Sequence, residues 1–295
     1  MTGATGFVGA RLLDHALAEG HQVRALTRRP QPARDGVIWI DGALDNPASL
    51  DALADGADVV IHVAGVINAP DAAGFEAGNV IGTGAMLAAA ERAGVKRFVH
   101  VSSLAAREPG LSHYGGSKAQ SEALVAAAPL STVIARPPAI YGPGDRETLE
   151  LFKMAARGFV LLPPKGRLSL IHVDDLARLL LALAASTDGG VIEPDDGRLG
   201  GWTHREFGEA LGRAVGRKVR TLSAPRLLIA LAARADRLVR GKNAKLTSDR
   251  AAYFCHPDWV VSPDRSPPTM LWRPSIPTEA GLADTARWYR EKGWL

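Results

Sequence analysis

The chain has 295 residues, of which 46% are hydrophobic and 22% are charged, and its formal net charge is +4. This length suits one large α/β domain with a smaller lobe, and the composition is that of a globular protein with a buried core. The single cysteine, Cys255, excludes an internal disulfide framework and a multi-cysteine metal site, and favours a reducing, cytoplasmic location. No lysine-rich tract and no apolar run of about 20 residues occurs, so we expect neither a nucleic-acid partner nor a transmembrane segment.

The chain opens with glycines at every third position. Gly3, Gly6 and Gly9 are followed by apolar residues at helical spacing as far as Gly20. Glycine allows a tight turn and the close approach of a pyrophosphate, and a helix N-terminus offers free N–H groups and a positive dipole end. The pattern therefore predicts that these glycines bind the pyrophosphate of a dinucleotide.

A turn of this kind normally follows a buried β-strand, but only Met1 precedes the stretch from Thr2 to Gly9. A central strand of about five residues contributes an amount comparable with a domain's whole stability of ~5–15 kcal/mol. We therefore expect the first strand to be missing or truncated here. Met1 would stand where a strand-ending apolar residue belongs, with translation starting upstream.

Strands and helices alternate after the glycine turn. Strands are expected at residues 21–27, 37–40, 58–63, 96–101 and 132–135, and helices at 46–54, 76–93 and 115–127. The run 58–63 is almost continuously apolar, as in a parallel strand that is buried on both faces. This order predicts an α/β fold with a doubly wound parallel sheet, a Rossmann domain.

The composition of the chain changes at Arg136, beyond which proline and glycine become frequent. Such a change is typical of a chain that leaves a regular sheet to build a second lobe. Residues 168–173 and the following helix are expected to return to the first domain. We predict a Rossmann domain of residues 1–142 plus about 168–190, and a smaller C-terminal α/β substrate lobe of about 143–167 and 191–295.

A basic amphipathic helix is expected at residues 225–240. It carries leucines at helical spacing, beginning with Leu227, beside four arginines. Such a helix can lie on a membrane or contact a lipid substrate. A lobe helix with its arginines in solvent is the simpler interpretation, and we favour it over peripheral membrane contact. A small-molecule substrate is the expected partner, and a homodimer remains open.

The end of the second expected strand reads Thr27-Arg28-Arg29, without a carboxylate. In dinucleotide-binding folds an acidic residue at this place binds a free ribose 2′-hydroxyl, whereas arginine accommodates a 2′-phosphate. We predict that Arg28 reads this phosphate. NADP(H) is therefore favoured as the cofactor, and NAD(H) remains open. The alternative is that one of the arginines is only a solvated surface residue.

A tyrosine and a lysine stand four residues apart at the start of a helix. The spacing of Tyr114 and Lys118 places both on one helix face, where the lysine charge favours ionisation of the phenol. Ser102 and Ser103 end the preceding strand, at the sheet edge where ligands bind, and a serine hydroxyl there can hold a carbonyl oxygen. Taken alone, the tyrosine could be a surface residue, the lysine a solvated one and the serines helix caps. All of them together, after a glycine turn, predict a proton-transfer site.

Together these motifs resemble the extended short-chain dehydrogenase/reductase family, the NAD-dependent epimerase/dehydratase group. The matching segments occur in family order: Thr2–Gly9, His62–Gly65, Asn79–Thr83, Phe98–Ser103, Tyr114–Lys118, Arg136–Gly144 and Ile171–Asp175. The C-terminal Trp272-Arg273-Pro274 also resembles the family. The set is specific for the family and says little about the substrate.

The resemblance implies roles for individual residues. Tyr114 would donate or accept the proton, Lys118 would orient the nicotinamide ribose and lower the tyrosine pKa, and Ser103 would hold the reacting oxygen. Asn79 would be a supporting polar residue. The implied cofactor contacts are Gly3, Thr5, Gly6, Phe7, Val8, Gly9, Arg28, Leu44, Ala64, Gly65, Tyr114, Lys118 and Arg136.

Two further departures from the family pattern bear on function. Ala43 stands where relatives often carry an aspartate that contacts adenine, so Leu44 and its neighbours would hold the ring by backbone and packing. Only ten residues separate Ser103 from Tyr114, which resembles atypical members related to a respiratory complex I accessory subunit. We predict an NAD(P)(H)-dependent oxidoreductase that transfers hydride between nicotinamide, NADPH favoured, and a carbonyl or secondary alcohol. A nucleotide-sugar epimerase/dehydratase and a non-catalytic NADP(H)-binding scaffold or assembly factor are the alternatives.

Overall fold

The computed structural model describes residues 1–241 and 247–295, which divide into two compact units. Unit 1 consists of Met1–Pro137, Leu176–Glu193 and Pro267–Arg273, and unit 2 of Pro138–Asp175, Pro194–Ser266 and Pro274–Leu295. The sequence places the corresponding boundaries at residues 142, 168 and 190. The assignment of one part to the cofactor and the other to the substrate stays a prediction.

Unit 1 contains two parallel ladders, which confirm the expected doubly wound α/β sheet. The first pairs β1 (Val23–Thr27) with β2 (Val37–Asp41). The second has the order β10-β5-β4-β3. Its strands are β3 (Val59–His62), β4 (Arg97–Val101), β5 (Ser131–Ala135) and β10 (Gly190–Ile192).

Met1 and Thr2 lie between the two ladders. Thr2 forms a parallel bridge with His62 and donates its backbone N–H to Ile61 O at 3.2 Å, while Met1 O accepts from Leu26 N at 3.1 Å. These two residues occupy the position, between β1 and β3, that a first strand takes in this topology. The winding of the chain reverses here, and this is where doubly wound sheets bind ligands.

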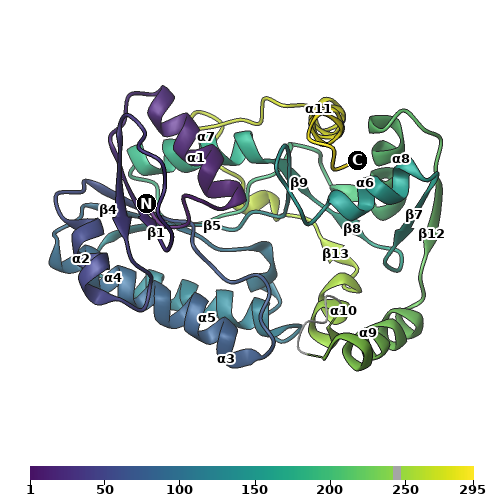
Figure 1. The fold of residues 1–295 in the computed structure, drawn as a ribbon, viewed down its shortest axis with the longest axis horizontal. Coiled ribbons are helices and arrows are strands. Elements are labelled where there is room, and N and C mark those ends of the chain that lie inside the picture. The colour runs from purple at the N-terminus through teal and green to yellow at the C-terminus, as the bar shows by residue number, and fades with distance from the viewer. Residues whose placement is uncertain (242–246) are drawn as a thin grey trace. The chain divides into compact units, whose positions relative to one another are not determined.

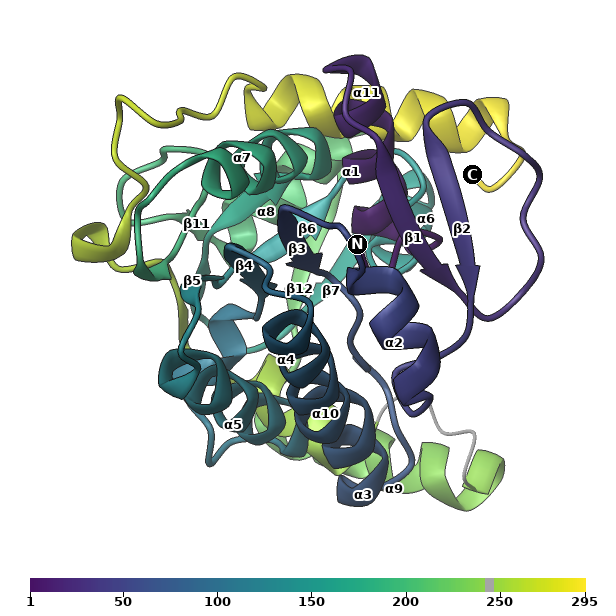
Figure 2. The same ribbon diagram turned by 90° about the vertical axis from the view of Figure 1, so that its left-hand side faces the viewer.

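Helices cover both faces of this sheet (Figure 1, Figure 2). On one face lie α1 (Phe7–Ala18) and the part of α7 (Val173–Ala185) that belongs to unit 1; on the other lie α2 (Pro47–Ala54), α4 (Gly82–Arg92) and α5 (His113–Ala127). The helix expected at 76–93 is more complex than predicted. A short α3 (Ala72–Phe75) and a π-helical turn (Glu76–Ile81) precede α4.

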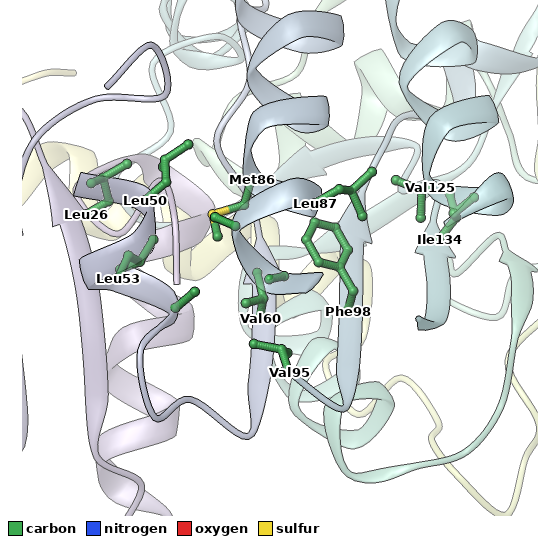
Figure 3. Packing of buried hydrophobic residues seen from close by; sticks show 13 residues of the cluster. Leu26, Leu50, Leu53, Val60, Met86, Leu87, Val95, Phe98, Val125 and Ile134 are labelled. Atoms are coloured by element: carbon green, nitrogen blue, oxygen red, sulfur yellow. The ribbon is translucent and has the colours of Figure 1, made fainter. Parts of the chain in front are cut away.

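The apolar core of unit 1 joins both ladders to the helices on one face (Figure 3). Leu26 of β1 belongs to the same cluster as Val60 of β3 and Phe98 of β4. Leu50 and Met86, from α2 and α4, are fully buried among them. This packing supports the sheet at the place where only Met1 and Thr2 connect the ladders through hydrogen bonds.

Unit 2 is built from short strands and helices around large aromatic rings. Its strands are β6 (Ala139–Tyr141), β7 (Phe159–Leu162), β8 (Arg167–Leu168), β9 (Leu170–His172), β11 (Trp202–Thr203), β12 (Arg220–Ser223) and β13 (Asp258–Trp259). Its helices are α6 (Leu149–Ala156), α8 (His204–Ala214), α9 (Arg226–Arg240), α10 (Ser248–Phe254) and α11 (Thr278–Glu291). Phe152 and Tyr289 meet edge to face with 5.1 Å between ring centroids.

No helix in the described parts of the chain combines the length and apolar character needed to cross a bilayer.

Two histidines are fully buried beneath the carboxyl edge of the unit 1 sheet. The rings of His62 and His100 stack with centroids 5.6 Å apart. His62 contacts the hydroxyls of Thr2 at 2.9 Å and Thr83 at 3.1 Å. Burial, with a smaller contribution from the Lys118 charge, lowers the pKa of His62 to about 3 and that of His100 well below its usual 6.5. Both imidazoles are therefore neutral in the folded protein.

These histidines predict that stability falls in mild acid. Between pH 6.5 and about 3 the unfolded chain binds a proton at His62 that the folded chain does not, so acid favours unfolding. The contribution of His62 to the free energy of unfolding is fully present above pH 6.5 and falls by about 2 kcal/mol at pH 5. Urea unfolding at a series of pH values measures this loss.

The His62→Gln variant serves as the comparison, and its loss of stability between pH 8 and pH 5 should be smaller than that of the wild type. An equal loss in both proteins contradicts the account. NMR titration of the imidazole in the folded wild type gives a second measurement, because protonation of His62 above pH 5 is also incompatible with it.

Candidate active site

The glycine turn leads directly into α1. Gly3 has a positive φ of 72°, and its carbonyl accepts a hydrogen bond from Gly6 N at 2.9 Å. Gly6 is the N-cap of α1, and no side chain caps the helix. The N–H groups of its first turn thus remain available to an anion, and no acidic residue opposes one.

Gly9 lets α1 pack directly on this turn. A Cβ atom at position 9 would lie 1.9 Å from Gly3 O, and one at Gly3 would lie 2.8 Å from Ala64 N. Gly6 is less constrained, because its Cβ would lie 3.3 Å from Gly3 O. Thr5 is exposed, while Phe7 and Val8 are half-buried at the start of α1. The geometry fits a pyrophosphate held by backbone N–H groups.

The loop after β3 lies against the same turn. Thr2 Oγ1 accepts from Ala64 N at 3.1 Å, which fixes this loop. A Cβ at Gly65 would lie 3.1 Å from Asn79 Oδ1 and 3.4 Å from Lys118 Nζ. Gly65 is exposed, so a ligand can approach its backbone beside these two polar side chains. Polar groups around a backbone without a Cβ suit a dinucleotide cofactor.

Asn79 explains the π-helical turn. Its side chain accepts from Val66 N at 2.6 Å and donates to Val66 O and to Ser117 Oγ, both at 2.9 Å. It is 1% exposed and connects the loop after β3 with α5. A π-helical turn is frequent at functional sites, and here it directs one amide at two neighbouring segments.

The hydroxyl of Ser103 lies close enough to the phenol of Tyr114 to influence its pKa. Ser103 follows β4 and is the N-cap of a 3₁₀ turn (Leu104–Arg107), and Tyr114 lies in the first turn of α5. Burial raises the pKa of Tyr114, and the Ser103 hydroxyl lowers it by a smaller amount. The two predicted catalytic oxygens therefore adjoin each other, and the phenol is protonated at neutral pH.

Lys118 lies one helical turn after Tyr114 and is 4% exposed. Its Nζ donates to Val101 O at 2.8 Å. Burial lowers the pKa of Lys118 to about 8, and the nearby carboxylate of Glu122 opposes that shift. The structure brings Lys118 and Ser103 to the same end of β4. The influence of Lys118 on the pKa of Tyr114 stays a prediction.

A buried ion-pair network that the sequence did not indicate lies one further turn along α5. Arg136 binds Glu122 through two nitrogens, at 2.8 and 2.5 Å, and Glu193 through its third at 3.3 Å. Ser102 Oγ donates to Glu122 Oε1 at 2.5 Å. The side chain of Arg136 is 13% exposed. The structure shows Arg136 hydrogen-bonded to two carboxylates. Contact between Arg136 and the cofactor stays a prediction.

The remaining predicted cofactor residues lie at the ends of β1 and β2. Arg28 is exposed immediately after β1, where the hydroxyl of Thr27 accepts from Arg29 N at 3.2 Å and shapes the turn. Leu44 packs towards α4, since a Cβ at Gly82 would lie 2.8 Å from its Cδ1. Their roles in binding the ribose phosphate and adenine stay predictions.

Comparison with known proteins identifies the family. A family model described as the NAD dependent epimerase/dehydratase family matches residues 1–194. The chain belongs to this family. A curated relative, the ceramide reductase of Caulobacter vibrioides (strain NA1000 / CB15N), is 40% identical over 311 aligned residues, covering 100% of this chain and 95% of the relative. The family assignment confirms the expectation of an NAD(P)-dependent enzyme.

Solved structures of this family share the fold. MoeE5 in complex with UDP-glucose and NAD superimposes with a TM-score of 0.75 at 22% sequence identity. The alignment covers 99% of this chain and 98% of the MoeE5 chain. The human epimerase family protein SDR39U1 with NADPH superimposes with a TM-score of 0.74 at 20% sequence identity. The alignment covers 97% of this chain and 98% of the SDR39U1 chain. At these identities the likeness concerns architecture alone. The family's own description names NAD, which supports a nicotinamide cofactor for this chain. The two solved structures hold NAD and NADPH, respectively.

The fit of Gly9 against the turn gives a test of the cofactor site. In Gly9→Ala the added Cβ forces α1 away from Gly3, and overpacking of this kind costs about 1–3 kcal/mol. We expect the affinity for NADPH to fall by about ten- to a hundredfold, as measured by titration calorimetry.

Gly110→Ala is the matched control, because a Cβ there meets nothing within 4 Å. This variant should keep the wild-type affinity. Thermal melting separates a loss of binding from a loss of folded protein. Unchanged affinity in folded Gly9→Ala contradicts the proposed turn.

Proposed function

We propose that this chain is an NADPH-dependent reductase that converts a ketone of an apolar, lipid-like molecule into a secondary alcohol. One observation carries the proposal: the hydroxyl of Ser103 is close enough to the phenol of Tyr114 to lower its pKa, and Lys118 is buried at the same end of β4. This is the arrangement that carbonyl reduction requires. In this reaction an acid protonates the oxygen on which negative charge develops, and a second group donates a hydrogen bond to the same oxygen.

The chain's own residues would handle the proton. The bound nicotinamide would supply the hydride to the carbonyl carbon. Ser103 would donate a hydrogen bond to the carbonyl oxygen, and Tyr114 would transfer its phenolic proton to that oxygen. Since burial raises the pKa of Tyr114, the phenol carries its proton at neutral pH and can donate it as negative charge develops on that oxygen. The phenolate left behind would regain its proton from solvent.

Lys118 would stabilise this phenolate. Its pKa of about 8 keeps most of the ammonium charged at neutral pH in spite of burial. Glu122 favours that charge, and Arg136 in turn fixes Glu122 by two hydrogen bonds. Glu122 and Arg136 would therefore act as positioning residues behind the site, through Lys118.

The substrate class is inferred from the full-length relative. The ceramide reductase of Caulobacter vibrioides matches this chain over its whole length at 40% identity, so the match includes both units. The nucleotide-sugar complex of MoeE5 matches in fold at 22% identity. The first comparison therefore has more bearing on substrate, and it supports a long-chain lipid with a reducible carbonyl.

Substitution of the proposed acid tests the reaction. Tyr114→Phe lacks the transferable proton, so the rate of NADPH oxidation with a long-chain ketone should fall about 10²–10⁴-fold. The affinity for NADPH should stay within a fewfold of wild type. Absorbance of NADPH measures the rate, and calorimetry measures the affinity.

Tyr253→Phe, a change in unit 2, removes the same hydroxyl from a different tyrosine and should retain turnover. Turnover in Tyr114→Phe equal to that of the wild type contradicts the mechanism. Absence of NADPH consumption by the wild type with every ketone tested favours a cofactor-binding scaffold, and conversion of a nucleotide sugar without net oxidation favours an epimerase.

The cofactor preference has its own test. Arg28→Ala removes the proposed partner of the 2′-phosphate, and a hydrogen bond to a charged group is worth about 1.5–3 kcal/mol. We expect the dissociation constant of NADPH to rise about ten- to a hundredfold, with that of NADH unchanged. Arg92→Ala, in the last turn of α4, is the matched control. Equal affinity of the wild type for NADPH and NADH contradicts the assignment.

A further inference from the structure

Helix α9 of unit 2 exposes its leucines as well as its arginines. Leu227 is 70% exposed, Leu231 47% and Leu238 87%. On another side of the helix, Ala233 is only 2% exposed. The sequence alone favoured a lobe helix with arginines in solvent. The structure shows that an apolar face is in solvent too, which ordinary packing within the lobe does not explain.

Three of the exposed leucines lie on one side of the helix. Leu227, Leu231 and Leu238 are separated by four and seven positions, so they share one side of the helix. Arg234 falls between the last two on the same side. We use the name α9 surface for this side together with the exposed apolar and basic residues that flank it: Leu227, Leu228, Leu231, Leu238, Val239, Arg226, Arg234 and Arg240.

A neighbouring strand extends the apolar character of the α9 surface. Leu222 of β12 pairs across the ladder with Leu161 of β7, and the two side chains are 51% and 49% exposed. Strand β12 ends at Ser223, three residues before α9 begins at Arg226, and Figure 1 shows the strand leading into the helix. The exposed leucines therefore belong to α9, to the strand that precedes it and to the paired strand β7, all in unit 2.

Positive charge is concentrated in the same stretch of sequence. Residues 217–240 contain seven basic residues and one acidic residue, a net charge of +6, whereas the whole chain carries +4. The remainder of the chain therefore has a net charge of −2. Exposed leucines set among arginines are the chemistry of a helix that lies in the plane of an anionic bilayer, with its apolar face among the acyl chains and its cations at the headgroups.

We propose that the α9 surface docks the protein on an anionic phospholipid bilayer. The inference deepens the proposed function, on which it rests, because a lipid ketone is dissolved in the membrane and a reductase on the bilayer surface has access to it. A second copy of the chain is the poorer occupant, since a symmetric contact would place two +6 segments together.

Vesicle binding by the full-length protein tests the proposal. In flotation experiments the protein should bind vesicles of phosphatidylglycerol and phosphatidylcholine, and bind pure phosphatidylcholine vesicles much less. Added salt should weaken binding. The double variant Leu227→Gln/Leu231→Gln should lower the partition coefficient more than about tenfold, and Arg234→Gln about fivefold.

Matched controls change residues elsewhere that are at least as exposed. Leu199, which is 90% exposed, and Met270, which is 93% exposed, give the double control Leu199→Gln/Met270→Gln. Arg205→Gln removes an exposed arginine of α8. The controls should bind like the wild type. No binding to anionic vesicles, or equal losses in the controls and the α9 variants, overturns the proposal.

Two readouts separate this proposal from the proposed function. Oxidation of NADPH with a short, water-soluble ketone should be unchanged in Leu227→Gln/Leu231→Gln, whereas reduction of a long-chain ketone embedded in vesicles should fall with the partition coefficient. Vesicle binding itself requires no turnover, so an inactive protein that binds vesicles refutes the reductase alone. A change of mass in solution on substitution of the α9 leucines, without vesicle binding, identifies a second copy as the occupant instead.

Discussion

The backbone hydrogen bonds of Met1 and Thr2 connect the two ladders of the unit 1 sheet, and the cofactor site depends on that connection. Met1 O accepts from β1 at Leu26, and Thr2 N donates to β3 at Ile61. The glycine turn starts at the next residue. Its position is thus fixed between two parallel strands, at the point where chain winding reverses and where ligands bind in such sheets. The Thr2 hydroxyl extends the same connection to His62 and Ala64.

The chemistry proposed for the site rests on burial around that edge. Burial raises the pKa of Tyr114 and lowers that of Lys118, so it makes the phenol a proton donor and leaves the ammonium dependent on its neighbours. The carboxylate of Glu122, which Arg136 holds in place, opposes part of the second effect. Buried charges of this kind are costly unless they are paired, and here each is paired. A rigid edge and a compensated lysine together suit hydride and proton transfer to one carbonyl.

Much of this site could be predicted from the sequence because its signals are local. Glycines three apart, an apolar strand and a tyrosine four residues before a lysine each have a fixed geometric meaning. The Glu122–Arg136–Glu193 network could not be predicted, because its members are 14 and 57 residues apart and come together only in the fold. The π-helical turn at Asn79 could not be predicted either, since the hydrogen bonds of Asn79 with Val66 join residues 13 apart. For α9 the pattern predicted an apolar face, but only the structure shows that the face is exposed.

The most direct test of the account is the fate of the hydride. NADPH carrying deuterium at the transferred position of its nicotinamide is supplied with a long-chain ketone, and the product alcohol is analysed by mass spectrometry. The account predicts one deuterium on the carbinol carbon, formed in step with NADPH oxidation and lost in Tyr114→Phe. Alcohol without deuterium, or deuterium that stays with the cofactor while a nucleotide sugar is converted, would contradict it.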